Sequence, residues 1–394
     1  MFADRTNWPL APNELSKLIE EFRSQGRPFL DLTESNPTHC GFTFNPDQIQ
    51  KALADPRSLT YDPDPRGPLV ARETVAQYYA ERDASLSPQQ IFLTASTSEA
   101  YSYAFRLLAN AGDSVLVPHP SYPLFEFLAG LNDLTVVPYP LAYHDGWTID
   151  IEAVKASARR WAGKVRAIVL VHPNNPTGSF VTQPELDALM GICKEHSLAL
   201  VADEVFADYA FASRAGRVVT HAAEERALTF TLSGLSKISA LPQMKLGWVV
   251  VSGPGNLLQQ ALARMEVIAD TYLSVSAPPA HALPKLLELR RQIQPRIRAQ
   301  VAANLRTMDG QLTPSNPVSR LRCDGGWCAI LRVPATRSDE SWAVELLARE
   351  QVLVHPGHFY DFPSDGHLVV SLLPSPDVFQ QGISRALSFI SQQA

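Results

Sequence analysis

The stretch Thr231–Trp248, TLSGLSKISALPQMKLGW, indicates how the rest of the chain is organised. The apolar run Leu228–Leu232 that leads into it is typical of a buried strand, and Gly247–Val251 begins a second one. Between them, Lys237 is predicted to lie in a compact turn of small residues rather than on a solvated helix face. A lysine in such a place loses hydration, which lowers its pKa and leaves an amine able to form a Schiff base. The alternative is a surface lysine in a loop between two strands.

Three further motifs precede this stretch in the chain. They are Thr94–Ala100 (TASTSEA), His172–Gly178 (HPNNPTG) and Ala202–Phe206 (ADEVF). Together with the stretch around Lys237, they resemble the pyridoxal-phosphate (PLP) aminotransferases of fold type I, class I/II. The resemblance extends from about Asp31 to the last predicted strand, and four ordered motifs are a far more specific signal than one short motif.

After Ser87 the chain alternates short apolar runs with amphipathic helical segments. This alternation is typical of an α/β fold with a mostly parallel sheet covered by helices on both faces. A small α/β unit with few strands follows, and the resemblance implies the PLP-dependent transferase fold of type I. The expected domains are a large PLP-binding domain over 46–280, a small C-terminal domain over 281–394, and an N-terminal segment 1–45 that packs with the small domain.

Composition excludes several classes of protein. The 394 residues carry a net charge of −6 with mixed signs throughout, so no nucleic-acid partner is expected. No run reaches the ~18 apolar residues that span a bilayer, and the first residues do not resemble a signal peptide. Four irregularly spaced cysteines suit neither a disulfide framework nor a zinc site. We therefore expect a soluble, cytoplasmic protein without a metal centre.

Pyridoxal phosphate needs a Schiff-base amine, a phosphate cradle, an anion at the pyridine nitrogen, a hydrogen bond to O3′ and a ring-stacking face. The resemblance implies that Lys237 forms the internal aldimine and then acts as general base. Asp203 closes the predicted strand LALVAD, at the edge of the sheet where α/β proteins bind ligands, and would keep the pyridine nitrogen protonated. The alternative for Asp203 is a helix or turn cap. Asn175 follows another apolar strand, and its amide suits O3′ of the cofactor.

The predicted phosphate cradle is Ser96, Thr97 and Ser98, which lie between the strand IFLT and the next helix. Backbone N–H groups at a helix N-terminus bind anions well. Ser236 is expected to add a hydroxyl contact, with Ser233 as a further candidate. Each serine taken singly is as easily explained as a helix N-cap.

Two tyrosines complete the cofactor site that the resemblance implies. Tyr122, in PSYP, matches the aromatic residue that stacks on the pyridine ring, although such a residue is more often part of a core. Tyr61, in YDPDPRG, matches the tyrosine that reaches the phosphate of the neighbouring subunit. The resemblance therefore implies a homodimer with shared active sites.

The sequence departs from the family pattern at two cofactor positions. Phe206 stands where many members have a tyrosine that donates to O3′, so Asn175 would be the main partner of that oxygen. Lys245 stands where the usual residue is a phosphate-binding arginine. Lysine keeps the charge but loses the bidentate fork.

A third departure concerns the substrate. The family places an arginine for the substrate α-carboxylate in the strand HLVVSLLPSP, but this chain has Val369 there. A pair of hydrogen bonds from a guanidinium to a carboxylate is hard to replace. Either another arginine binds the carboxylate, with Arg332 the first candidate before Arg322 and Arg66, or the substrate is not an ordinary α-amino acid. Asn175 is the second predicted substrate contact.

His355 and His358, in VHPGHFYDF, are expected to line the same cleft, although a single histidine there is more often structural.

These residues predict a PLP-dependent aminotransferase (EC 2.6.1.-) that moves an amino group from an amino acid to a 2-oxo acid by a ping-pong mechanism. A PLP-dependent C–S lyase could use the same Lys237 and Asp203. A non-catalytic PLP-binding module would carry a helix-turn-helix segment, for which the region before about Asp31 leaves no room. An α/β enzyme without PLP, matching the motifs by chance, is the remaining alternative. The motifs do not determine which amino donor and which acceptor are used.

Overall fold

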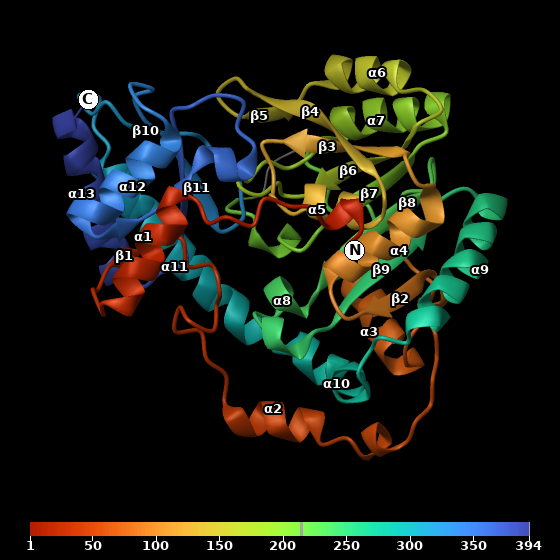
Figure 1. Cartoon of the computed structure of the whole chain (residues 1–394). Helices are drawn as coiled ribbons and strands as arrows, with labels where there is room; N and C mark the ends of the chain where they lie inside the picture. Colours follow the sequence, from red (N-terminus) through yellow and green to blue (C-terminus); the bar gives the residue numbers. More distant parts are fainter. Residues whose placement is uncertain (213–215, 394) are drawn as a thin grey trace.

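The computed structural model describes residues 1–212 and 216–393 and shows a large and a small sheet, each packed with helices (Figure 1). The strands of the large sheet are β2 (Ile91–Thr94), β3 (Ser114–His119), β4 (Thr135–Tyr143), β5 (Trp147–Ile149), β6 (Val165–Val171), β7 (Ala199–Asp203), β8 (Thr229–Gly234) and β9 (Gly247–Ser252). Their spatial order is β2-β9-β8-β7-β6-β3-β4-β5.

The large sheet is mostly parallel, as the alternating pattern predicts. Strands β4, β3, β6, β7 and β8 pair in parallel, whereas β5 is antiparallel to β4. Strand β9 is antiparallel to both β8 and β2, so β2 runs in the same direction as β8. The carboxyl ends of β2, β3, β6, β7 and β8 therefore meet at one edge of the sheet.

Helices cover both faces of this sheet because its strands are apolar on both sides. In β6, Ala167 and Val169 belong to the core under one set of helices, and Ile168 and Leu170 belong to the core on the opposite face. The first face carries α4 (Thr97–Leu108), α5 (Phe125–Leu131) and α9 (Gly255–Tyr272). The second carries α3 (Leu69–Ala80), α6 (Ile151–Arg160), α7 (Gln183–His196), α8 (Leu235–Ile238) and α10 (Ala277–Glu288).

The C-terminal part forms a separate antiparallel sheet in the order β10-β11-β14-β13. Its strands are β10 (Ser319–Arg320), β11 (Cys328–Arg332), β13 (His355–Pro356) and β14 (His367–Ser371), and its helices are α11 (Arg290–Gln311), α12 (Asp339–Glu350) and α13 (Pro376–Gln393). The N-terminal segment packs here: Leu15 and Phe22 of α1 (Glu14–Ser24) are buried in the same core as Trp342. Strand β1 (Leu30–Asp31) also pairs in parallel with β12 (Val352–Leu353), and Figure 1 shows α1 beside α12.

Some elements differ from the sequence-based expectation. Lys237 lies on the one-turn helix α8 rather than in an irregular turn. Helix α2 (Pro46–Leu53) was not predicted, although its N-terminus has a clear signal, since the Asn45 side chain accepts from Asp47 N and Pro46 opens the helix. Strands β5, β10 and β13 are too short to show a period in sequence. The short 3₁₀ helices are η1 (Asp4–Thr6), η2 (Pro56–Leu59), η3 (Pro88–Gln90), η4 (Ala207–Tyr209), η5 (Pro242–Met244) and η6 (Gly357–Tyr360).

Within the described ranges, no helix has the length and apolar character needed to cross a bilayer. The four cysteines are all free thiols.

Candidate active site

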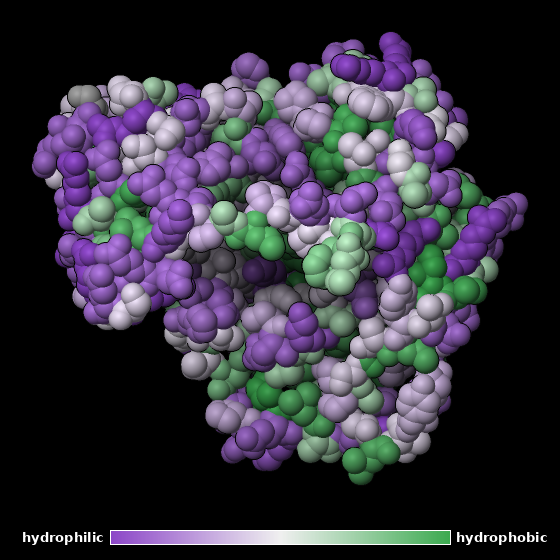
Figure 2. Space-filling model, in the orientation of Figure 1, coloured by the Kyte–Doolittle hydropathy of each residue, from purple (hydrophilic) through white to green (hydrophobic). Residues whose placement is uncertain are grey.

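A cavity of about 560 Å³ lies where the carboxyl edge of the large sheet faces the C-terminal part. Figure 2 shows the molecule hollowed near the centre of this face, and Figure 1 places α5 and α8 beside the hollow. Ligands of α/β proteins bind at the carboxyl ends of the strands, because loops and helix N-termini with free polar groups gather there. The motifs after β2, β3, β6, β7 and β8 all reach this cavity.

Lys237 lines the cavity from α8. Its Nζ lies 5.0 Å from the ring centroid of Trp327 and 5.4 Å from that of Phe206. Burial lowers the pKa of this amine, while the charge of Asp203 opposes the shift. The environment therefore favours the neutral, nucleophilic form of the lysine.

Asp203 ends β7 with its carboxylate in the same cavity. Its Oδ1 accepts from Val205 N at 3.0 Å and its Oδ2 accepts from the Tyr101 hydroxyl at 3.1 Å. Burial raises the pKa of Asp203 to about 6 despite these two donors. A cationic N–H donor placed in the cavity would restore the ionised form and satisfy the carboxylate. Tyr101, on the sheet-facing side of α4, was not identified from the sequence, because nothing in its local pattern distinguishes it from a core tyrosine.

Ser96, Thr97 and Ser98 line the cavity at the N-terminus of α4. The Ser96 hydroxyl accepts from Glu99 N at 3.2 Å, so this serine is a helix N-cap as well as a cavity residue. The first N–H groups of a helix have no partner within the helix and carry partial positive charge. This end of α4 is therefore suited to an anion.

Ser236 and Lys245 line the cavity beside these serines, whereas Ser233 does not. Ser233 is buried in β8. Lys245 precedes β9 in a left-handed conformation with φ of 49°. At Gly247 a Cβ would lie 3.2 Å from the carbonyl carbon of Ser96, so the absent side chain lets the two segments approach closely.

Asn175 and Tyr122 also line the cavity. The preceding Asn174 is buried, and its side chain bonds to Ser121, Pro120 and Thr177. The Asn175 amide makes no hydrogen bond to another described residue and is available to a ligand. Tyr122 remains 46% exposed, so its ring is not held in a core.

Together these residues form one side of the cavity, which we call the sheet-edge wall. It consists of Ser96, Thr97, Ser98, Tyr122, Asn175, Asp203, Ser236, Lys237 and Lys245. The opposite side, the C-terminal wall, consists of Trp327, Cys328, His355, Phe359, Tyr360, Val369 and Ser371. Apart from His355, the acidic and basic side chains among the described residues that line the cavity are Asp203, Lys237 and Lys245, all in the sheet-edge wall.

None of the three arginines considered for the substrate carboxylate lines this cavity. Arg332 is exposed at the end of β11, with its guanidinium 5.5 Å from the Tyr143 ring centroid. Arg322 forms an ion pair with Asp324 at 3.3 Å. Arg66 forms one with Glu266 at 2.5 Å, away from the cavity. The placement of these side chains depends on tertiary packing that no local motif encodes.

Tyr61 and one of the two histidines also lie outside the cavity. Tyr61 is 81% exposed and borders a different pocket. His355 lines the cavity and contacts the Tyr360 hydroxyl at 3.1 Å, whereas His358 is exposed and does not line it. Burial lowers the pKa of His355, which favours the neutral ring.

The donor set of the sheet-edge wall fits pyridoxal phosphate. A buried amine with a lowered pKa, a carboxylate that needs a cationic partner, a free amide and an exposed aromatic ring surround one space, and the N-terminus of α4, which is suited to an anion, borders it. The groups come from separate strand ends, so their convergence is a property of the fold.

Known proteins match this chain over nearly its whole length. The family described as "Aminotransferase class I and II" matches residues 27–378. Glutamate-pyruvate aminotransferase AlaA of Escherichia coli is 27% identical and aligns over 95% of this chain and 93% of its own. Alanine aminotransferase of Mycobacterium bovis is 26% identical over 93% of this chain and 86% of its own.

Solved structures agree with this comparison. A crystal structure of an Escherichia coli aminotransferase superposes with a TM-score of 0.84 at 25% identity, covering 99% of this chain and 98% of its own. Alanine aminotransferase from Pyrococcus furiosus superposes with a TM-score of 0.86 over the whole of both chains, and at 19% identity it supports the fold alone. These relatives favour transamination over the lyase alternative. The chain therefore belongs to the aminotransferase class I and II family and is a PLP-dependent enzyme that moves an amino group from an amino acid to a 2-oxo acid.

Proposed function

We propose that Lys237 is the amine that bonds the cofactor and the base that moves the substrate proton. The observation that carries this assignment is the position of its amine, which is buried, has a lowered pKa and lines the same cavity as Asp203. A neutral amine can attack an aldehyde, and once displaced it can accept a proton.

The other residues of the sheet-edge wall are assigned by the chemistry of their side chains. Pyridoxal phosphate, when bound, supplies the aldehyde that takes the amino group and a pyridinium ring that withdraws electrons from the reacting carbon. Asp203 would hold the proton on the ring nitrogen, and Asn175 would donate to the ring oxygen. Tyr122 would cover one face of the ring.

The phosphate would bind at the N-terminus of α4. Ser96, Thr97 and Ser98 offer hydroxyl and N–H donors there, and Ser236 and Lys245 approach from α8 and the start of β9. The Lys245 ammonium would act as a point charge rather than as a bidentate fork.

A homodimer in the cytoplasm is the proposed form of the enzyme. Tyr61 and Leu59 are 81% and 90% exposed in a loop rich in proline, as expected of side chains that a second subunit covers. Tyr61 would then reach the phosphate site of that subunit. Sedimentation of the wild type and of Tyr61→Ser, with the cofactor dissociation constant of each, tests this assignment. A monomeric wild type would contradict it.

The relatives named above act, by their names, on glutamate, pyruvate and alanine. We propose these three compounds as the first substrates to test, with other amino acids after them. The neutral C-terminal wall gives no described arginine for an α-carboxylate, so the preferred donor has to be found by measurement.

A visible absorbance spectrum tests the assignment of Lys237. The purified protein should show the band of a covalently held cofactor, and the band should shift when a productive amino donor is added. Lys237→Ala should remove the band and lower the transamination rate by about 10²–10⁴-fold through the lost proton transfer alone. Lys155→Ala, on an exposed helix face, is the control and should change neither. A band that survives in Lys237→Ala would overturn the assignment.

A further inference from the structure

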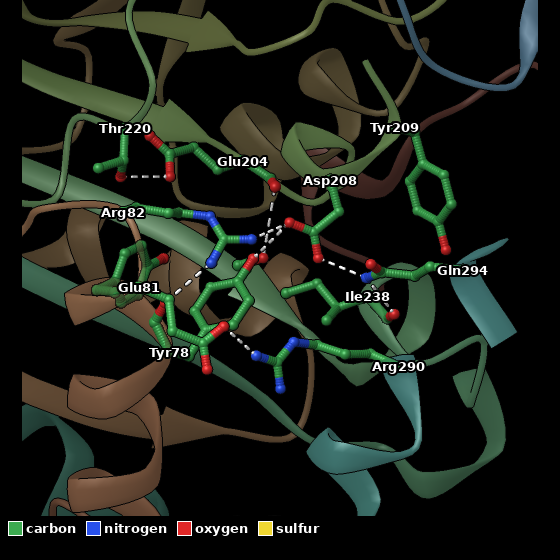
Figure 3. Close-up of polar contacts among 12 residues, drawn as sticks. Tyr78, Glu81, Arg82, Glu204, Asp208, Tyr209, Thr220, Ile238, Arg290 and Gln294 are labelled. Carbon is green, nitrogen blue, oxygen red and sulfur yellow. Dashed lines mark hydrogen bonds and ion pairs between the residues drawn. The ribbon is translucent and has the colours of Figure 1, made fainter. Parts of the chain in front are cut away.

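A buried polar cluster adjoins α8 through the carbonyl of Ile238, and Figure 3 shows several of its side chains pointing toward Asp208. Its centre is Asp208 of η4, whose side chain is only 3% exposed. The carboxylate accepts from the Tyr78 hydroxyl at 3.3 Å, from the Arg82 guanidinium and from Gln294 Nε2 at 2.5 Å. We call Tyr78, Arg82, Asp208 and Gln294 the Asp208 hub.

The hub is joined to the helix that carries Lys237. Gln294 Nε2 also donates to the carbonyl of Ile238 at 2.8 Å, and the Tyr209 hydroxyl donates to the carbonyl of Lys237 at 2.7 Å. Helix α8 has only four residues, so its backbone bonds cannot fix its direction on their own. Two buried side chains from η4 and α11 therefore hold the carbonyl end of the turn from which the Lys237 amine projects.

Helix α11 connects this support to the C-terminal part. Gln294 lies in its first turns, and Arg298 donates twice to the carbonyl of Asp208. Farther along the same helix, Gln300 and Asn304 donate to carbonyls of the segment 372–374, which directly follows β14. One helix thus touches both the support of Lys237 and the part of the chain that forms the C-terminal wall.

A carboxylate this deeply buried is costly unless every donor is in place, and apolar packing of the same volume would stabilise a fold equally well. Fully bonded polar networks do, however, fix one arrangement of the elements that they join. The arrangement fixed here is the direction of α8 relative to η4 and α11.

We propose that Asp208, Tyr209 and Gln294 are positioning residues for Lys237. They hold the carbonyl groups of α8 so that the Lys237 amine points into the cavity toward Asp203. They also fix the position of α8 relative to α11. This inference rests on the proposed role of Lys237. The alternative is that the Asp208 hub stabilises the fold without affecting the reaction.

The test compares two glutamines of α11. Gln294→Met keeps the length of the side chain and leaves Asp208 with Tyr78 and Arg82, but it removes the bonds to Asp208 and to the Ile238 carbonyl. Gln300→Met also removes two amide hydrogen bonds, to the carbonyls of Leu373 and Pro374, farther along the same helix. Tyr209→Phe is a second variant, since it deletes only the hydroxyl and keeps the ring against Trp327.

Two measurements separate positioning from stability. In cofactor-free protein, the amides of residues 235–241 should exchange hydrogen about fivefold faster in Gln294→Met than in Gln300→Met, as expected for loss of one hydrogen bond. In cofactor-loaded protein, kcat should fall by up to about a hundredfold in Gln294→Met with KM little changed, because the amine is displaced but the substrate contacts remain. Tyr209→Phe should change both quantities in the same direction.

Equal kcat in Gln294→Met and Gln300→Met would overturn the proposal, even if the amides of residues 235–241 exchanged hydrogen faster in Gln294→Met. The Asp208 hub would then stabilise the fold without affecting the reaction. Equal exchange at residues 235–241 would overturn it as well. A wild-type protein without a cofactor band would instead contradict the role of Lys237, and the exchange measurement on cofactor-free protein does not depend on that role.

Discussion

The two walls of the cavity differ in charge and in origin. The sheet-edge wall holds the acidic and basic side chains of Asp203, Lys237 and Lys245, each placed near the end or the start of a strand. In the C-terminal wall, burial favours a neutral His355, and its other side chains carry no charge at neutral pH. The wall proposed for the cofactor is therefore built from fixed polar chemistry, while the wall proposed for the substrate is shaped by packing.

This difference shows which properties the common fold constrains. A cofactor with a phosphate and a ring nitrogen needs ionic partners, and the sheet-edge wall offers side chains of both signs. The C-terminal wall, proposed for the substrate, is assembled from several short elements, and Val369 stands in it where the family pattern has an arginine. A substrate carboxylate at this wall would meet the hydroxyls of Tyr360 and Ser371 rather than a guanidinium.

The largest expected effect comes from removing a charge of the sheet-edge wall. Asp203→Asn keeps the shape of the side chain but cannot hold a proton on the ring nitrogen. We expect kcat/KM to fall by about 10²–10³-fold, the cost of losing one preorganised electrostatic partner. Asp187→Asn, on the protein surface, should leave kcat/KM unchanged. If Asp203→Asn and the wild type have equal kcat/KM, the Asp203 carboxylate does not contribute its charge to the reaction.

Asp203→Asn is also expected to change how the stability of the cofactor-free protein depends on pH. The pKa of Asp203 is raised to about 6 in the folded chain, so its contribution to stability is present below the unfolded pKa of about 4 and is lost as the pH rises through 6. Between pH 4 and pH 7 the wild type should lose about 2 kcal/mol relative to Asp203→Asn. Urea unfolding of both proteins at the two pH values measures this difference. Parallel pH profiles would contradict the raised pKa.

The C-terminal wall is tested by adding the charge that it lacks. Val369→Arg places a guanidinium at a buried position of the cavity and should lower KM for amino acids by about tenfold relative to Val369→Met, the effect of a charged hydrogen bond. Val369→Met is the matched control, because it adds length without charge. If the two variants have the same KM, the substrate carboxylate does not lie within reach of position 369.

A smaller effect is expected where the two walls meet at Phe206 and Trp327, whose rings pack edge to face at 5.2 Å. Phe206→Tyr adds a hydroxyl close to the Lys237 amine and to the predicted O3′ position. A hydrogen bond to the ionised cofactor should lower, by about one unit, the pH at which the visible absorbance changes. A spectrophotometric titration of both proteins measures the shift. An unchanged midpoint would mean that this hydroxyl does not reach the cofactor.

The smallest effect is expected at Arg332. From sequence it is the first candidate for the substrate carboxylate, but its side chain lies over Tyr143 and outside the cavity. Arg332→Ala should therefore change KM for amino acids by less than about twofold, as is usual for a surface substitution. Steady-state kinetics measure this change in KM. A large rise in KM would show that Arg332 does contact the substrate.

The sheet and the sheet-edge wall were largely predictable from local sequence. Apart from Lys245, which precedes β9, each predicted residue of that wall ends a strand or follows one within a few positions, so the periodic pattern also predicted on which edge it would lie. Tyr101, Gln294 and the residues of the C-terminal wall other than His355 were not predicted from the sequence. They reach the site from helix faces and from strands of two to five residues, where a side chain in a core and a side chain at a site share the same pattern.

The sequence by itself therefore determined the family, the parallel sheet and most of the groups that line the sheet-edge wall, because these depend on strand ends and on short motifs. Only the tertiary structure decided which arginines stay outside the cavity, how neutral its second wall is, and how Asp208 and Gln294 support α8. These features depend on contacts between segments far apart in the chain: Gln294 lies 86 residues from Asp208 and 56 from Ile238, and no local pattern records such distances.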